Sequence, residues 1–168
     1  MKRFIIMTVI LAWITAGLFA NGTNEDPTPT QTSDFSGYSS WTKVNSKTIT
    51  GDMFGVLGGA HERAKGFREI FVNSTGKPVE FGEAPYPFPA GTIIVKESYK
   101  NNNGKKGALS NLTVMVKREK GYSEKYGDWE FILANADGKI KTQGPLRSCI
   151  TCHSKSKGKD YTFFNAKM

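Results

Sequence analysis

The sequence contains few cysteines and histidines, two of each in 168 residues. No cysteine directly follows the apolar N-terminal run, which excludes a lipid anchor at that point. The chain also lacks an internal repeat, and its length suits one domain with a real core better than two. It has no nucleic-acid recognition motif, so its formal charge of +8 does not indicate a nucleic-acid partner.

The N-terminal residues have the layout of a secretory signal peptide. Lys2 and Arg3 precede an apolar run that ends in small residues, so we expect a signal peptide over 1–20, cleaved after Ala20. A retained membrane anchor is the alternative, but the run is short for spanning, and we expect no stable anchor. Residues 21–40 are polar and predict a flexible linker, and 41–168 predict the folded domain. Export implies a periplasmic protein.

The domain reads as a succession of strands. The residue patterns over 67–74, 91–99, 111–119 and 128–141 predict strands, and Asp137-Gly138 is a strong hairpin signal within the last of these ranges. The segments between them, such as "APYPFPAG" and "NNNGKKG", read as turns. Short polar connections favour an antiparallel sheet, so we expect a mainly β fold of the α+β type. Short helices are expected over 36–46 and before Cys149.

Both cysteines lie in "CITCH", where Cys149 and Cys152 are three residues apart and His153 follows directly. A redox dithiol normally lies in a βαβ unit, which this sequence does not show. A zinc site needs four ligands, which Cys149, Cys152, His153 and His61 could supply, but Cys152 and His153 are neighbours that point in diverging directions. A c-type haem motif uses all three residues. One helical turn lets both thiols reach the porphyrin vinyl groups, and His153 then becomes the axial ligand of the iron.

The function depends on the sixth position of the iron, since an open site binds small molecules and two strong ligands favour electron transfer. Nothing in the sequence demands a second strong ligand, so we expect five-coordinate iron. A six-coordinate electron-transfer cytochrome is the alternative. Met115 lies in an apolar strand run, where core packing is its ordinary role. The candidate sixth ligands or distal residues are His61, Met53, Met115, Met168 and the lysines.

Most of residues 41–168 resembles the cytochrome P-460 family, which includes the cytochromes c′-beta. The resemblance rests on "FREIFVN", "YPFPAGTIIVKES", "VMVKRE", "GDWEF", "CITCH" and "DYTFF" in this order and spacing. It implies an antiparallel β fold, often a homodimer, with one haem c attached near the C-terminus by Cys149 and Cys152 and ligated by His153. It also implies an open distal face for small ligands such as nitric oxide or hydroxylamine.

The resemblance leaves two functions open. In cytochromes P-460 a lysine is bonded to the porphyrin edge and hydroxylamine is oxidised, and Lys96 matches that lysine. In cytochromes c′-beta the bond is absent and gases bind. An amine attacks a porphyrin only when burial keeps it neutral. Oxidation would also need a base near the bound nitrogen and an electron-transfer partner protein, and the candidate carboxylates are those of Glu97, Glu119 and Glu130.

Overall fold

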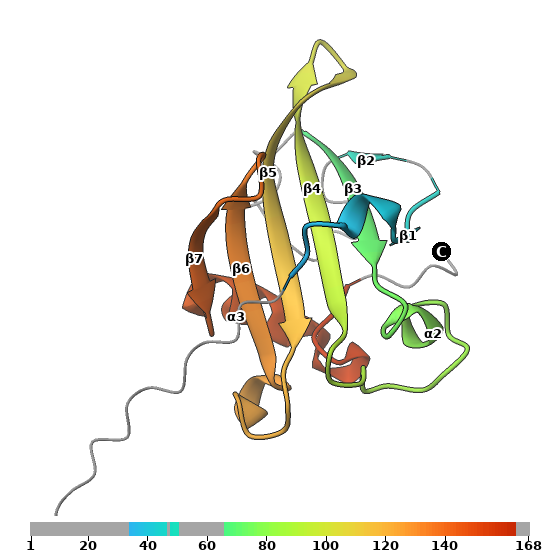
Figure 1. Cartoon of the computed structure of the whole chain (residues 1–168), viewed down its shortest axis with the longest axis vertical. Helices are drawn as coiled ribbons and strands as arrows, with labels where there is room; N and C mark the ends of the chain where they lie inside the picture. Colours follow the sequence, from blue (N-terminus) through green and yellow to red (C-terminus); the bar gives the residue numbers. More distant parts are fainter. Residues whose placement is uncertain (1–33, 47, 51–65, 164–168) are drawn as a thin grey trace, which may run out of the picture. The chain divides into compact units, whose positions relative to one another are not determined.

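The computed structural model describes residues 34–46, 48–50 and 66–163 (Figure 1). Within these ranges seven strands form one sheet in the order β1-β3-β4-β5-β6-β7, with β2 also pairing with β3. All the pairings are antiparallel, which confirms the predicted mainly β fold. The strands are β1 (Thr42–Lys43), β2 (Ile49–Thr50), β3 (Phe67–Val72), β4 (Ile93–Asn102), β5 (Lys105–Lys117), β6 (Trp129–Asn135) and β7 (Ile140–Gly144).

The helical elements of the described residues are short. They are η1 (Tyr38–Ser40), α2 (Lys77–Glu80), η2 (Glu124–Tyr126), α3 (Arg147–His153) and η3 (Ser154–Lys159). None of the helices in the described ranges has the length and apolar character needed to cross a membrane.

The β4–β5 hairpin is longer than the sequence predicts. The segment "NNNGKKG" reads as a loop, but both strands continue through it and only Asn103 and Gly104 form the turn, with φ of 50° and 80°. An Asn-Gly turn with two positive φ values matches the twist of the flanking strands, so pairing extends to the tip. The Asp137-Gly138 turn between β6 and β7 is confirmed, and Asp137 Oδ1 accepts the Lys139 N–H at 3.0 Å.

The sheet buries a separate apolar cluster on each face, because strand side chains alternate. Figure 1 shows α3 behind the sheet and η1 in front of it, and we call these two sides the α3 face and the η1 face. The α3 face carries the buried cluster of Val44, Ile70, Val72, Val79, Phe88, Ile94, Met115, Trp129, Phe131, Ile150 and Tyr161. The η1 face carries that of Phe35, Val95, Leu112, Val114, Val116, Ile132 and Ala134.

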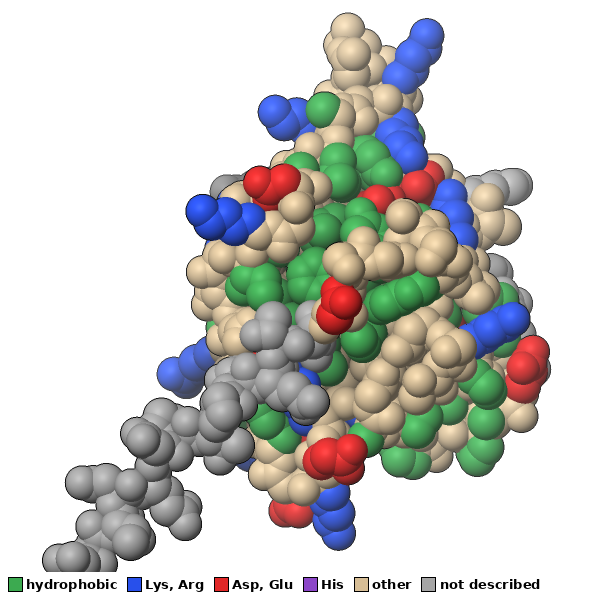
Figure 2. Space-filling view, viewed as in Figure 1, with side chains coloured by type: hydrophobic (Ala, Val, Ile, Leu, Met, Phe, Trp, Pro, Cys, Tyr) green, Lys and Arg blue, Asp and Glu red, His purple; other side chains and the backbone are tan. Residues whose placement is uncertain are grey.

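The segment before β1 packs against the sheet instead of forming the helix predicted over 36–46. Only Tyr38–Ser40 are helical, as one 3-10 turn, and β1 follows. Phe35 is 6% exposed within the η1-face cluster, so burial of this ring on the sheet outweighs local helix formation. Ordered packing therefore begins within the last residues of the stretch predicted as linker. Figure 2 shows apolar side chains gathered over the middle of this face.

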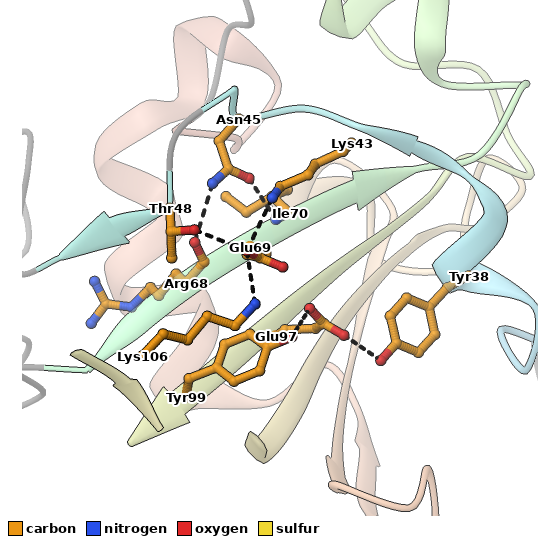
Figure 3. A network of polar contacts seen from close by, with 10 residues as sticks. All are labelled: Tyr38, Lys43, Asn45, Thr48, Arg68, Glu69, Ile70, Glu97, Tyr99 and Lys106. Atoms are coloured by element: carbon orange, nitrogen blue, oxygen red, sulfur yellow. Dashed lines mark hydrogen bonds and ion pairs between the residues drawn. The ribbon is translucent and has the colours of Figure 1, made fainter. Parts of the chain in front are cut away.

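Two carboxylates on the η1 face bind η1 to β4 and β1 to β3 (Figure 3). Glu69 and Glu97 lie directly opposite each other, which alone would be unfavourable. Glu69 is neutralised by two lysines, and Glu97 is hydrogen-bonded by two tyrosines. Glu69 pairs with Lys43 at 3.0 Å and Lys106 at 2.9 Å. The Glu97 oxygens accept hydrogen bonds from the hydroxyls of Tyr38 at 2.7 Å and Tyr99 at 2.5 Å.

Candidate functional site

α3 carries the three residues of the "CITCH" motif. β7 ends at Gly144, where φ is 128°, and Pro145 follows, so the chain leaves the sheet and enters the helix within three residues. Ile150 is buried against the sheet and anchors the helix. Cys149 and Cys152 are free thiols, both half-buried, and lie one helical turn apart. This confirms the expected helical turn at the motif.

The imidazole of His153 is held in one orientation. Its Nδ1 lies 2.6 Å from the carbonyl oxygen of Tyr161. A carbonyl can only accept, so Nδ1 carries the proton, and in a neutral imidazole the lone pair then belongs to Nε2. The rings of Phe131 and Phe163 flank the imidazole, with centroids at 5.2 and 5.1 Å. Protonation at Nδ1 is what an imidazole that binds a metal through Nε2 requires.

The carbonyl that holds His153 belongs to a tightly anchored turn at Asp160 and Tyr161. The Asp160 carboxylate accepts hydrogen bonds from Lys117 Nζ, at 2.8 Å to Oδ1 and 2.7 Å to Oδ2. Its Oδ2 also accepts the Phe88 N–H at 2.8 Å. The indole N–H of Trp129 donates to the Asp160 carbonyl at 2.8 Å. Sequence reasoning missed Lys117, although strand alternation places it on the same side as Met115.

Lys96 lies on the α3 face near the motif. Its neighbours across the sheet are Ile70 on β3 and Thr113 on β5. Burial lowers the pKa of the Lys96 amine and the Arg68 charge lowers it further, whereas the thiols of Cys149 and Cys152 raise it. The structure therefore brings Lys96 together with the two cysteines and favours its neutral form more than water does.

Of the other candidate ligands and distal residues, one packs in the core and three lie outside the described residues. Met115 is 7% exposed in the α3-face cluster, between Ile94 and Phe131 on the adjacent strands. It lies on the α3 face and packs in the core, the ordinary role of a methionine in an apolar strand run. His61, Met53 and Met168 lie outside the described residues.

Two of the three candidate carboxylates lie on the η1 face, and the third is exposed beyond the end of its strand. Glu97 and Glu130 lie on the η1 face, opposite Leu112 and Val116 respectively, whose side chains belong to its cluster. Glu97 binds two tyrosines, and Glu130 pairs with Arg118. Glu119 follows the end of β5 and is exposed. Among these candidates, therefore, no base is in place for a ligand on the α3 face.

Sequence reasoning also missed Glu80, which lies on the single helical turn α2. Its side chain is 1% exposed, and neither carboxylate oxygen has a hydrogen-bond partner within the described part of the chain. Burial raises the pKa of Glu80 to about 7. One turn of helix offers no periodicity from which this burial could be predicted.

Glu80→Gln is expected to stabilise the protein in alkaline solution. The folded state holds the Glu80 proton up to about pH 7, and the unfolded chain releases it near 4.5. The contribution of Glu80 to the free energy of unfolding is therefore fully present below the pKa of the unfolded chain. It is lost as pH rises through the pKa of the folded state, by about 3 kcal/mol in total. We expect Glu80→Gln to raise the free energy of unfolding at pH 8 by about 2 kcal/mol and to change it little at pH 4. Urea unfolding at both pH values measures this, and equal effects at the two would contradict it.

The residues present fit a haem group better than the two alternatives. Two thiols one turn apart, an imidazole held through Nδ1 and a half-buried lysine lie on one side of the sheet. β7, which precedes α3, is an antiparallel edge strand and not part of a βαβ unit. In the described ranges no three His, Cys, Asp or Glu side chains gather into a metal site. His61, which the zinc interpretation requires, lies outside those ranges.

An antiparallel sheet with a c-type haem motif packed on one face defines a class of β-sheet cytochromes. The model of the Cytochrome P460 family matches residues 35–164. The match covers most of the chain, so this protein belongs to that family, and membership implies that it binds haem c. A comparison with curated proteins gives no match.

Proposed function

We propose that this chain is an exported protein with a single, covalently attached haem c that binds small nitrogen oxides, nitric oxide above all, at five-coordinate iron. The thiols of Cys149 and Cys152 hold the porphyrin, and His153 Nε2 is the axial ligand. The observation that carries the proposal is the His153 imidazole, oriented by Tyr161 directly beside the cysteine pair. Residues 1–20 serve as the signal peptide and the polar residues after them as a linker.

The α3 face supports the binding of a small ligand by what its side chains offer. Haem, when bound, supplies an iron that takes a diatomic ligand. Lys96, Thr113 and Leu133 lie side by side on adjacent strands and are half-buried. Ile70 and Ile94 beside them are buried apolar residues. This wall favours a small, weakly polar ligand such as a diatomic oxide and provides no carboxylate from the three candidates above.

Carbon monoxide tests the open site. We expect the reduced protein, produced in a host that matures c-type cytochromes, to change its Soret spectrum on addition of carbon monoxide or nitric oxide, because no strong sixth ligand must be displaced. A Met115→Leu variant is the control, since a packing residue can be replaced by a similar volume without changing coordination. An unchanged spectrum with both gases would favour the six-coordinate electron-transfer alternative.

Hydroxylamine oxidation is the second candidate function, favoured by the position of Lys96. Its amine is near both thiols and its pKa is lowered by burial, which is the condition for attack on a porphyrin edge. Oxidation also needs a base and an electron acceptor. Glu97 and Glu130 lie on the η1 face and Glu119 is exposed after the end of β5, so gas binding remains the leading proposal.

Peptide mapping separates the two functions. We expect protease digestion to release Lys96 in a linear peptide and to release haem bound only to the peptide that contains Cys149 and Cys152. A haem peptide whose mass includes both segments would instead identify an oxidoreductase. Lys96→Met is the matched variant: in a gas-binding protein it leaves the mass of the haem peptide unchanged.

The charge distribution supports an acidic partner protein for electron exchange. Residues 138–159 contain six basic residues and no acidic one. Their summed charge equals the formal net charge of the whole chain after Lys2 and Arg3 are removed with the signal peptide. This stretch includes α3 and η3, where Arg147, Lys157 and Lys159 are exposed. If the reaction of the protein with an anionic oxidant does not accelerate at low salt, the result would count against the acidic partner.

We also propose a homodimer. A monomer mass by light scattering would exclude it.

A further inference from the structure

The turn at Asp160 and Tyr161 has a conformation that neither residue adopts readily. Their φ values are 48° and 63°, in the left-handed region that disfavours side chains with a Cβ. Two consecutive residues of this kind persist only where the surroundings determine them. The turn aims the Tyr161 carbonyl at His153 Nδ1.

The strongest restraint on the turn comes from Lys117. Lys117 and Asp160 are each 8% exposed, and their side chains form a buried ion pair in which both carboxylate oxygens accept from one ammonium. Lys117 is the last residue of β5, so the restraint connects the sheet directly to the turn. The Trp129 indole adds a second restraint by donating to the Asp160 carbonyl.

We propose that Lys117, through Asp160, is a positioning residue that sets the orientation and basicity of the axial ligand His153. The ion pair fixes Asp160, the peptide that follows fixes the Tyr161 carbonyl, and this carbonyl polarises the Nδ1–H bond. A polarised Nδ1–H makes the imidazole a stronger donor through Nε2. The inference rests on the proposed ligation of iron by His153.

Loss of the ion pair has a defined spectroscopic consequence. A relaxed turn withdraws the Tyr161 carbonyl, so the imidazole donates less strongly to the metal and ferric iron is less stabilised. The Fe–His stretching frequency of the ferrous protein should fall, and the reduction potential should rise. A purely structural ion pair would lower stability without moving either quantity.

The test uses Lys117→Met, which keeps the aliphatic stem and removes the charge, in the haem-loaded full chain. We expect a lower Fe–His frequency by resonance Raman and a higher potential by redox titration, and Lys117→Arg should restore both in part. Trp129→Phe keeps most of the ring volume and removes the indole donor to Asp160. It should shift both quantities in the same direction, and it provides the measurement if Lys117→Met does not fold.

Arg118→Met is the matched control, one residue along the chain. Arg118 forms the ion pair with Glu130, which is fully buried on the η1 face, so its loss destabilises the fold from the side away from His153. We expect lower stability with unchanged Fe–His frequency and potential. The inference is wrong if the folded Lys117 and Trp129 variants keep wild-type values, or if Arg118→Met shifts them equally. A wild-type protein without haem, or without an Fe–His band, would instead contradict the proposed function itself.

Discussion

Serine in place of Cys149 is expected to leave little soluble protein. The thiol is half-buried beside the α3-face cluster, and haem attached there would cover the half-buried residues around it. A domain that folds around a large apolar ligand loses the stabilisation of that ligand when attachment fails. We expect soluble yield to fall several-fold or more, because a change of 1–2 kcal/mol already has that effect in cells. Yield and haem absorbance of the purified protein are the measurements.

His153→Ala should give a similar loss, since it removes the proposed axial ligand and the hydrogen bond to Tyr161. Thr151→Ala is the matched control within the same helix. Thr151 lies between the two cysteines, is exposed, and donates only to the Arg147 carbonyl one turn earlier, at 2.9 Å. Its loss should change yield and absorbance little. A folded, colourless Cys149→Ser protein in normal amounts would be incompatible with the proposed role of haem.

The strands and the haem motif could be predicted from sequence because each signal is local. Alternation identified the strand runs, and the spacing of Cys149, Cys152 and His153 pointed to a helical turn beside a porphyrin. Alternation also grouped Lys96 with Ile94 and Thr92. It could not tell which side of the sheet α3 would cover, because that depends on how the chain returns after β7.

The support of His153 could not be predicted in the same way. Lys117 and Asp160 are 43 positions apart, and nothing local marks either as a partner of the other. The predicted helix over 36–46 failed for a related reason, since burial of Phe35 on the sheet decides its conformation. Residues whose role is set by long-range contacts are those the sequence left unassigned.

Gly127→Ala is expected to destabilise the protein strongly, because a methyl group there would collide with the turn that holds His153. A Cβ at Gly127 would lie 2.7 Å from Tyr161 Cε2 and 3.0 Å from Asp160 Oδ1, and φ is already +68°. The left-handed backbone costs about 1 kcal/mol for alanine, and overpacking adds about 2 kcal/mol. The measurement is the free energy of unfolding by urea, which we expect to fall by about 3 kcal/mol in total.

Gly138→Ala isolates the collision from the backbone effect. Gly138 also has a positive φ, +85°, but nothing lies within 4 Å of its Cβ position, so only the loss of about 1 kcal/mol is expected. Tyr161 cannot retreat easily from an alanine at 127, because its hydroxyl donates to the Lys125 carbonyl at 2.9 Å and its carbonyl accepts from His153. The strain must therefore be borne by the turn or relieved by displacing His153. Equal losses of stability in the two glycine variants would show that this turn yields freely, and it could not then be what orients the imidazole.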